Sequence, residues 1–550
     1  CSIILARTKE NSRFNKAVDE VFEKSKSAYL RLLAALVDRT FAGVVTMVLV
    51  LGGSVWLFTQ IPSEFSPRED RGNFNLLIRG PEGSSYNYTM EHLDQVEKRL
   101  MHFVEDGAVQ RMLMRAPGSF GTTASYHDSR GIFVMSDWKE RKPVWHYMDE
   151  ARRLTEDIPG VRITSTVRRA FGGGAQKPVQ FVLGGPSYED LLEWRDILIE
   201  KARENPGLTE IDHDYYETKP QIGISIDRDL AADLGVPVSV IGRTLETMMG
   251  TRRVTTFIER GREYDVILES EKSGKSSPLD ITNSFVRSSR TGELVPLSSF
   301  VTLNEFADAT ALNRYNRVRS ITIQAGLAEG YSLDQALDYL ENVVRNDLPA
   351  GASYDYKGES LDLRESGSSI YVVFALALLV VYLALAGQFE SLVHPFIIML
   401  TVPMAVTGAL LSLWVTGQTL NIYSQIGLII LVGLSAKNGI LIVEFINQLR
   451  DEGVAFRDAI LEAAGKRLRP IIMTTVTTIM GAVPLVMAAG AGAESRFVIG
   501  VVIIGGLCLS MLLTVFVVPM MYCILAKNTG SPSAVGHELE KQLAAYKNRN

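Results

Sequence analysis

The stretch IGLIILVGLSAKNGILIVEFI, residues 426–446, is apolar or small at almost every position, and Lys437 interrupts it. The stretch is long enough to cross roughly 30 Å of hydrocarbon as one helix. Lys437 lies about 16 Å along that helix from Ile426, and therefore near the centre of a bilayer. A charge at this depth costs about 3 kcal/mol even on lenient insertion scales. The stretch therefore predicts a membrane-spanning helix that carries a lysine for a functional reason.

Lys437 needs a partner that this sequence does not offer at the same depth. The lysine can lose its proton, extend to the membrane surface or pair with an acid, and its distance from both surfaces favours pairing. Glu444 is close to the end of the run, and Glu390 and Glu494 fall between apolar runs. We expect the carboxylate to come from outside these 550 residues. A merely tolerated lysine is the other interpretation.

The next apolar run offers neutral polar groups. The segment MTTVTTIM, residues 473–480, places Thr474 with Thr477 or Thr478 on one helical face. Their hydroxyls can solvate an ammonium but cannot neutralise it. Threonines in membrane helices also donate to carbonyls of their own helix, and we expect this of Thr475 and Thr477.

Apolar runs of spanning length occur six times, and their flanking charges predict an orientation. The runs are at about 41–61, 369–387, 395–416, 425–446, 470–490 and 497–525. The basic residues beside them are Arg31, Arg39, Arg450, Arg457, Lys466, Arg467, Arg469 and Lys527, with only Arg496 in the opposite loops. Both termini and the 447–469 loop are therefore expected in the cytoplasm. The insert from 62 to 366 is expected on the far side.

The composition fits a membrane protein with a large polar insert. Of the 550 residues, 47% are hydrophobic and 21% charged. The net charge of −6 and the lack of a basic block argue against nucleic acid as a partner. Three cysteines, Cys1, Cys508 and Cys523, leave the insert without a disulfide framework. Residues 1–40 predict an amphipathic helix on the membrane surface, and the start at Cys1 suggests a fragment or a processed product.

The insert repeats a strand–helix–strand pattern. It begins with PVQFVLGG, residues 178–185, and returns with RSITIQA, residues 319–325. Two such units separated by a long insertion are the halves of a split β-α-β-β-α-β layer. A similar order runs from NFNLLIRG, residues 73–80, to VRITSTV, residues 161–167. The sequence predicts two ferredoxin-like subdomains and an inserted module at 218–317.

Motifs of catalysis are missing from the sequence. It has no HExxH, no cluster of Cys and His with metal-ligand spacing and no nucleophile elbow, and its seven histidines are scattered. The glycine-rich AFGGGAQ, residues 170–176, has no Walker lysine and predicts a flexible loop. We expect no enzyme, no cofactor and no resident metal.

Five segments resemble the resistance–nodulation–division (RND) family, in its multidrug (hydrophobe/amphiphile) efflux branch. They are GLSAKNGILIVEF (433–445), KRLRPIIMTTVTTIMGAVPLV (466–486), IPSEFSPREDRGNF (61–74), FIERGREYDVIL (257–268) and GQFESLVHPFIIMLTVPMAVTGALL (387–411). The resemblance covers nearly the whole chain, in order. It implies that the six spans are the seventh to twelfth of a twelve-span protomer, whose first half holds an aspartate pair facing Lys437.

The resemblance also implies a mechanism and its residues. Lys437 and Thr474 fall on proton-relay positions, with Asn438 beside the lysine and Arg467 at the cytoplasmic end. It implies a proton antiporter in the Gram-negative inner membrane, in contact with membrane lipid, that exports small amphiphilic substrates. It further implies a homotrimer that works with a periplasmic adaptor and an outer-membrane channel.

The expected fold class is an α-helical polytopic bundle of six spans with a large periplasmic α+β region of ferredoxin-like porter subdomains and an inserted docking module. The expected units are a cytoplasmic amphipathic segment (1–40), the first span (41–61), a first porter subdomain (66–177), a second (178–217 with 318–362), the docking module (218–317), a five-span bundle (369–525) and a cytoplasmic tail (526–550).

This sequence departs from the family's pattern in the expected substrate pocket. Phe120 and Phe133 fall on two of its phenylalanine positions, but Leu113 and the PGSFG turn, residues 117–121, replace others. Fewer aromatic residues leave the substrate spectrum open. Phe133 fits equally well as a core residue of a strand.

Two alternatives remain. Met112, Met114 and Met135 are soft ligands that could serve efflux of copper(I) or silver, although methionines two apart on a strand also share a core-facing side. A truncated or split half, without the carboxylates, would act only as a binding or scaffold partner.

Overall fold

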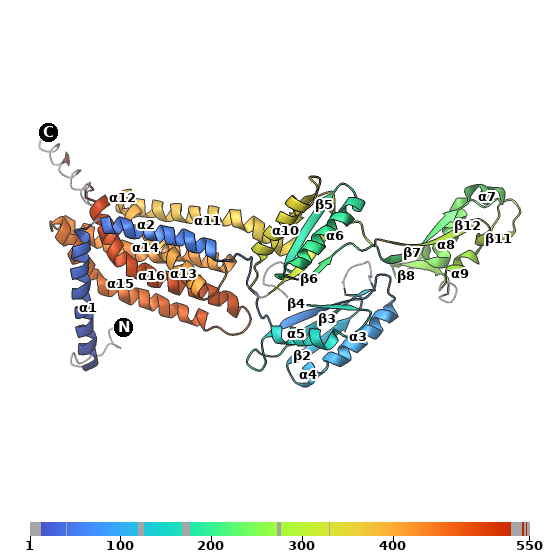
Figure 1. Cartoon of the computed structure of the whole chain (residues 1–550), viewed down its shortest axis with the longest axis horizontal. Helices are drawn as coiled ribbons and strands as arrows, with labels where there is room; N and C mark the ends of the chain where they lie inside the picture. Colours follow the sequence, from blue (N-terminus) through green and yellow to red (C-terminus); the bar gives the residue numbers. More distant parts are fainter. Residues whose placement is uncertain are drawn as a thin grey trace.

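The computed structural model describes residues 13–39, 41–118, 126–167, 176–271, 277–328, 330–527 and 529, with isolated positions of the tail. The molecule is elongated, with a helical bundle at one end, an α+β region in the middle and a smaller strand-rich module at the other end (Figure 1). This architecture confirms the predicted fold class.

Six of the described helical segments are long and apolar enough to cross a membrane. They are α2 (Phe41–Gln60), α11 (Gly358–Phe389), α12 (Val393–Met399) continued by α13 (Thr401–Val415), α14 (Ile422–Asp451), α15 (Phe456–Val486) and α16 (Ala493–Leu525). One expectation was wrong: residues 447–469 are helical apart from 452–455. Their polar sequence hid this, because Leu449 and Ile460 still bury their side chains in the bundle core.

Helix α1 (Arg13–Val37) runs across the end of the bundle that lies farthest from the α+β region (Figure 1). Leu33 and Val37 are buried in the bundle core. Asp19 pairs with Arg469 at 2.7 Å, and Asp38 pairs with Arg457 at 2.9 Å. This position fits the predicted amphipathic helix at a membrane surface.

Glycines allow α13 and α16 to pack closely. A Cβ at Gly408 would lie 2.6 Å from the carbonyl oxygen of Gly505 and 2.7 Å from Cβ of Leu509. Small residues at such crossings let two membrane helices approach.

Gly408→Val is expected to force α13 and α16 apart and to destabilise the bundle by about 1–3 kcal/mol, as overpacking does in other cores. The thermal unfolding midpoint of the purified protein in detergent measures this. Gly52→Val on α2 is the matched control, because a Cβ at Gly52 meets nothing within 4 Å. Equal midpoints for the two variants would contradict the packing argument.

The first sheet of the α+β region has the strand order β2-β3-β1-β4, all antiparallel. Its elements are β1 (Asn73–Arg79), α3 (Tyr86–Leu100), α4 (His102–Glu105), β2 (Val109–Arg115), β3 (Asp128–Met135), α5 (Val144–Thr155) and β4 (Arg162–Val167). This is the order of a split β-α-β-β-α-β layer, as predicted. The helices cover one face, where Leu93, Val96 and Ala151 pack on Phe74 and Phe133.

The second sheet repeats this order from two separated segments. Strand β14 pairs with β5 and β6, and β5 also pairs with β15. The elements are β5 (Val179–Gly185), α6 (Tyr188–Glu204), β6 (Leu208–His213), β13 (Arg314–Tyr315), β14 (Val318–Leu327), α10 (Leu333–Asp347) and β15 (Ser353–Tyr356). Ser332 starts α10 with a capping box, in which Gln335 is the reciprocal partner.

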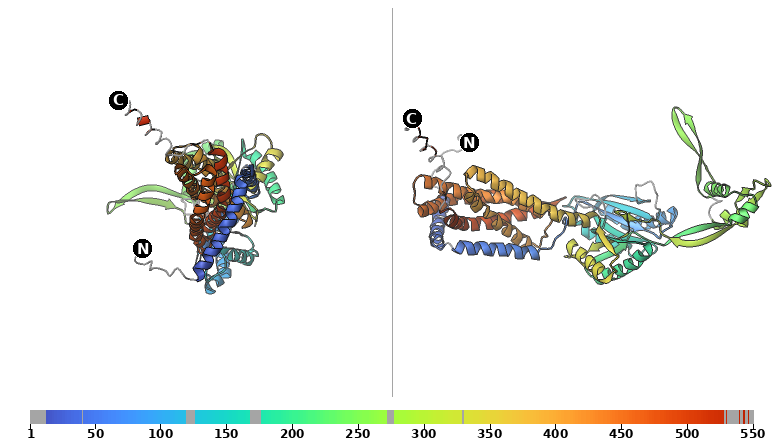
Figure 2. Two further views of the ribbon diagram at one scale, coloured as in Figure 1. Left: turned by 90° about the vertical axis from the view of Figure 1, so that its left-hand side faces the viewer. Right: turned by 90° about the horizontal axis from the view of Figure 1, so that it is seen from above.

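The chain between β6 and β13 forms the distal module. Its elements are β7 (Lys219–Ile226), α7 (Arg228–Asp233), α8 (Val238–Met249), β8 (Thr251–Glu259), β9 (Arg262–Glu269), α9 (Pro278–Thr282), β10 (Phe285–Arg287), β11 (Leu294–Pro296) and β12 (Val301–Asp308). Strands β7 and β12 join it to the rest, and the β8–β9 hairpin projects away from the molecule (Figure 2). The module has its own small core around Ile241, Leu297 and Phe300.

Helix α11 connects the α+β region to the bundle without a break (Figure 1). Near its start, Arg364 donates to three carboxylates of α10: Asp334 at 2.9 Å, Asp338 at 2.6 Å and Glu341 at 2.7 Å. A movement of this helix in the bundle would therefore be carried directly to the second sheet.

Candidate functional site

Helix α14 carries Lys437 through the middle of the bundle. Asn421 caps the helix: its side chain accepts hydrogen bonds from the backbone of Tyr423 and Ser424, both at 3.1 Å. Lys437 is then about 22 Å along a helix that continues to Asp451. The lysine is therefore near the middle of the helix.

Lys437 lies on an exposed stripe of α14. The other exposed positions of the stripe are Ile426, Ile430, Gly433, Glu444 and Gln448. Their spacing of three or four residues, or a multiple, puts them on one helical face. The opposite face is buried against the bundle through residues such as Val432, Ile442 and Val443. Among the residues that the structure describes, one side of α14 is thus covered and the other is not.

No residue that the structure describes forms an ion pair or hydrogen bond with the Lys437 amine. Glu444 shares the stripe but lies seven residues further on, about 10 Å along the axis. The structure therefore leaves open, as the sequence did, which carboxylate pairs with Lys437. An ammonium occupies the middle of a membrane helix and lacks a carboxylate within the described chain.

The threonines of α15 are occupied by other bonds. Thr477 donates to the carbonyl of Met473 at 2.8 Å, as expected, and Thr474 donates to that of Ile471 at 3.2 Å. Thr475 instead accepts a hydrogen bond of 3.3 Å from the side-chain amide of Asn438. Asn438 and Thr475 are both buried, so this bond joins α14 to α15 one residue away from Lys437.

Arg467 contacts α14 near the opposite end of the stripe. Its guanidinium lies over the ring of Phe445 at 4.4 Å, a cation–π distance. Its Nε is buried and has no hydrogen-bond partner within the described chain. Asn438 and Arg467 thus contact across α14 and α15, whereas Thr474 is bonded within α15 and Lys437 lies on the exposed stripe.

Two phenylalanines, Phe120 and Phe133, are predicted to contact substrate. Phe120 lies outside the described residues. Phe133 is fully buried and stacks on Phe74 with ring centroids 4.5 Å apart, so it occupies a core position of β3. Substrate contact by Phe133 stays a prediction. Leu113, on the opposite face of the same sheet, is exposed.

The methionines of the metal alternative pack in the same core as Phe133. Met112 lies opposite Phe133 in the sheet register, and Met114 lies opposite Gly131. Met135 is buried at the end of β3. These positions favour the core interpretation of the three sulfurs.

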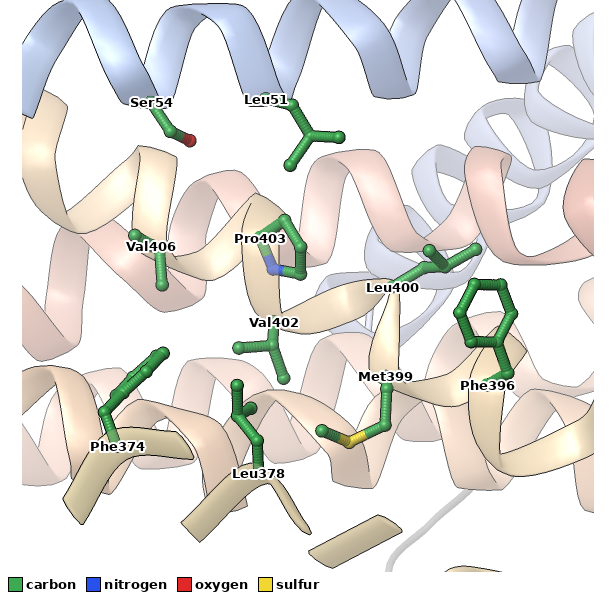
Figure 3. A pocket seen from close by; sticks show the side chains of 10 residues that line it. All are labelled: Leu51, Ser54, Phe374, Leu378, Phe396, Met399, Leu400, Val402, Pro403 and Val406. Atoms are coloured by element: carbon green, nitrogen blue, oxygen red, sulfur yellow. The ribbon is translucent and has the colours of Figure 1, made fainter. Parts of the chain in front are cut away.

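An apolar cavity of about 370 Å³ lies between α2, α11 and the α12–α13 segment (Figure 3). Ser54 is the one polar side chain among its lining residues, and its hydroxyl lies 2.5 Å from that of Thr407. Phe374, Phe396 and Met399 line much of the rest. A cavity of this kind suits hydrocarbon and has no charged group for proton chemistry.

A charged cluster between the two sheets was missed by the sequence reasoning. Asp212 of β6 accepts hydrogen bonds from Arg162 of β4 at 3.0 Å and from Tyr216. Arg79 of β1 lies 3.5 Å from the same carboxylate. The cluster depends on how the two sheets pack, and no local sequence signal announces it.

A family model, the AcrB/AcrD/AcrF family, matches residues 1–526. The chain belongs to this family of RND efflux transporters. It is accordingly a multi-pass membrane protein of a family of transporters rather than enzymes.

Individual members of the family align over most of this chain. The multidrug/solvent efflux pump membrane transporter MepB of Pseudomonas putida is 33% identical over 524 residues, which are 93% of this chain and 49% of MepB. The multidrug export protein AcrF of Escherichia coli is 31% identical over 517 residues, 92% of this chain and 50% of AcrF. The toluene efflux pump membrane transporter TtgB of P. putida is 32% identical over 524 residues. The chain therefore spans about half the length of the curated relatives it matches.

Proposed function

We propose that this chain is the C-terminal half of a proton-driven exporter of drugs and other small amphiphiles in a Gram-negative inner membrane. Its six spans would be the seventh to twelfth of a twelve-span protomer. The N-terminal half would supply an aspartate pair facing Lys437. RND transporters work with an adaptor and an outer channel, and we propose a homotrimer with a periplasmic adaptor and an outer-membrane channel for this protein.

The observation that carries the proposal is the uncovered stripe around Lys437. An ammonium at mid-depth is unfavourable unless an acid or water accompanies it. The stripe lies along the whole of α14, as a helix–helix contact requires. A second helical half seated on this stripe would bury the lysine and bring its carboxylates to the required depth.

The basic residues support the orientation. Arg469 pairs with Asp19 of α1 and Arg457 with Asp38 just after it, and α1 lies at the end of the bundle away from the α+β region (Figure 1). Lysine and arginine accumulate on the cytoplasmic side of membrane proteins. The α+β region and the distal module would then lie in the periplasm.

Proton coupling would act through a two-state ion pair. With the aspartates ionised, Lys437 is held by them; when a proton arrives from the periplasm, the pair loosens and α14 shifts. Asn438 would transmit the shift to α15 through Thr475, with Thr474 and Arg467 as the further relay groups. Helix α11, held to α10 by Arg364, offers a rigid route from the bundle to the substrate-binding sheets.

Expression of the halves together and apart tests the proposal. This chain alone should not export the dye N-phenyl-1-naphthylamine from pump-deficient cells, and co-expression with the N-terminal half should restore export. Export by this chain alone would overturn the assignment as a half. Membrane-inserted halves that bind one another but never transport would favour the scaffold alternative. This alternative arises because the chain matches only about half the length of its relatives.

Phe120→Ala and Phe133→Ala are expected to give opposite patterns. Phe120→Ala should change the resistance to some drugs and leave others unaltered, as loss of one pocket contact does. Phe133→Ala should lower resistance to all drugs together, because truncating a buried phenylalanine costs about 3–5 kcal/mol. Drug susceptibility and membrane-protein yield, measured side by side, check both. A selective loss with normal yield in Phe133→Ala would instead support substrate contact.

A further inference from the structure

The α2–β1 segment, which joins the bundle to the first sheet, is paired by its backbone with the start of α14. The amide of Glu64 donates to the carbonyl of Leu420 at 3.1 Å, and the amide of Leu420 donates to that of Pro62 at 2.9 Å. The amide of Ile422, the first residue of α14, donates to the carbonyl of Phe65 at 3.2 Å. Helix α14 is therefore held at its start by the segment that continues into β1.

A side-chain bond continues this contact. Tyr423, in the first turn of α14, donates its hydroxyl to the carboxylate of Glu69, which is almost fully buried. The same carboxylate accepts from Nε of Arg71 at 2.8 Å. Tyr423 precedes Lys437 by 14 residues, about 21 Å and nearly four turns, so the two residues lie near one face of the helix. A movement of α14 at Lys437 would therefore reach Glu69 through one continuous helix.

Helix α16 contacts the next residue of the α2–β1 segment. Glu494, in the first turn of α16, accepts a hydrogen bond of 3.2 Å from the backbone amide of Asp70. The carbonyl of Asp70 accepts from the indole of Trp138 at 3.0 Å, and a Cβ at Gly490 would lie 3.8 Å from this indole. The Asp70 carboxylate accepts from the amide of Val144, the first residue of α5, at 2.9 Å. Asp70 thus joins the start of α16 to the first sheet and its helix.

Two buried carboxylate oxygens at this contact have no hydrogen-bond partner among the described residues. They are Oε1 of Glu69 and Oε2 of Glu494. Buried polar atoms are almost always bonded in a fixed structural junction. The two free acceptors allow these carboxylates to exchange partners when α14 or α16 shifts.

We propose that Tyr423 and Glu494 are positioning residues that transmit movements of α14 and α16 to the first sheet. The inference rests on the proposed function and adds a second route to it. Helix α11 serves the second sheet through Arg364, whereas the α2–β1 segment serves the first sheet. The route to the first sheet begins on the helix that carries Lys437.

A double-mutant cycle in the complete transporter measures this coupling. Hydrogen exchange of β1 is compared in the wild type, Lys437→Ala, Tyr423→Phe and the double variant, all in lipid nanodiscs. Lys437→Ala should change the exchange rate of β1 about tenfold in the wild-type background, as expected for a coupling through one hydrogen bond to a charged group. The same substitution should change it less than about twofold in the Tyr423→Phe background. A merely structural role of Tyr423 would leave the two effects additive.

Dye efflux gives the second readout. Tyr423→Phe and Glu494→Ala should each lower the rate of N-phenyl-1-naphthylamine efflux about tenfold and leave the affinity of the purified transporter for the dye unchanged. Glu494→Gln should retain most of the rate, because its amide oxygen can accept the same bond from Asp70. Tyr371→Phe is the matched control, since this tyrosine of α11 is exposed and its hydroxyl makes no hydrogen bond within the described chain.

Equal effects of Lys437→Ala on β1 in the two backgrounds would overturn the inference, and so would the absence of any effect in the wild-type background. Normal efflux in both Tyr423→Phe and Glu494→Ala would overturn it as well. A fall in dye affinity parallel to the fall in efflux would indicate a disturbed sheet and would also contradict a positioning role. Normal efflux in Lys437→Ala would count against the proposed function, whereas the exchange cycle on the purified protein would still decide the inference.

Discussion

Lys437→Ala in the complete transporter is expected to abolish proton-driven export and to leave the protein folded and assembled. The variant removes the only basic group at mid-depth of α14, and the acids that face it would then be protonated permanently. In the proposed mechanism, the bundle would lose the ion pair whose formation and loss switch it between two states. Removing one member of a desolvated ion pair should change the equilibrium constant between the two states of the bundle by more than about a hundredfold. Initial rates of dye efflux from energised cells measure the effect.

The control for this experiment is Lys201→Ala, which removes an exposed lysine of α6 that pairs with Glu204 on the surface. Surface pairs of this kind contribute little, and efflux should stay normal. Elution of Lys437→Ala at the position of the wild-type oligomer shows that assembly is intact. Resistance equal to that of the wild type in Lys437→Ala would refute the relay.

Asp70→Ala is expected to destabilise the α+β region by about 3–5 kcal/mol, because it leaves the buried guanidinium of Arg141 without its partner. Asp70 accepts from Nη1 and Nη2 of Arg141 at 2.7 and 2.8 Å. It also accepts from the backbone amides of Gly72 at 3.0 Å and Val144 at 2.9 Å. The carboxylate therefore joins β1 to the start of α5. Hydrogen exchange of β1 in the purified protein should become at least about a hundredfold faster.

The same carboxylate predicts a pH dependence. Burial alone would raise the pKa of Asp70, but the hydrogen bonds from Arg141 and the two amides outweigh it and hold the pKa below 3.8. The stabilisation is therefore fully present above that value and is lost as the pH falls through the lowered pKa. Asp149→Ala is the control, since Asp149 and Arg152 form an exposed pair of 3.8 Å. Equal exchange rates in the two variants would refute the role of Asp70.

The sequence was sufficient for the spans, the repeat and the isolation of Lys437. Membrane spans depend on length and apolarity alone, so the run around Lys437 identified α14. The two sheets could be predicted from the strand–helix–strand order. When helices must cover one face of a sheet, few arrangements of strands and helices are possible.

Features that depend on packing between distant segments could not be predicted from the sequence. Whether Phe133 faces the core or the opposite side depends on which face of the sheet the helices cover, and the alternation of a strand allows both. The contact of Arg162 with Asp212 joins residues from two subdomains, and neither residue has a distinctive sequence neighbourhood. Asn438 was placed beside Lys437 by resemblance, but its bond to Thr475 required the geometry of α14 against α15.

The distance from Nζ of Lys437 to the closest carboxylate oxygen in a structure of the complete, assembled transporter tests directly whether this lysine pairs with an acid of another half. We expect a separation of about 4 Å or less, to an aspartate outside these 550 residues, in at least one state of the cycle. A lysine that faces lipid, or whose amine is satisfied only by groups of its own chain, would contradict it.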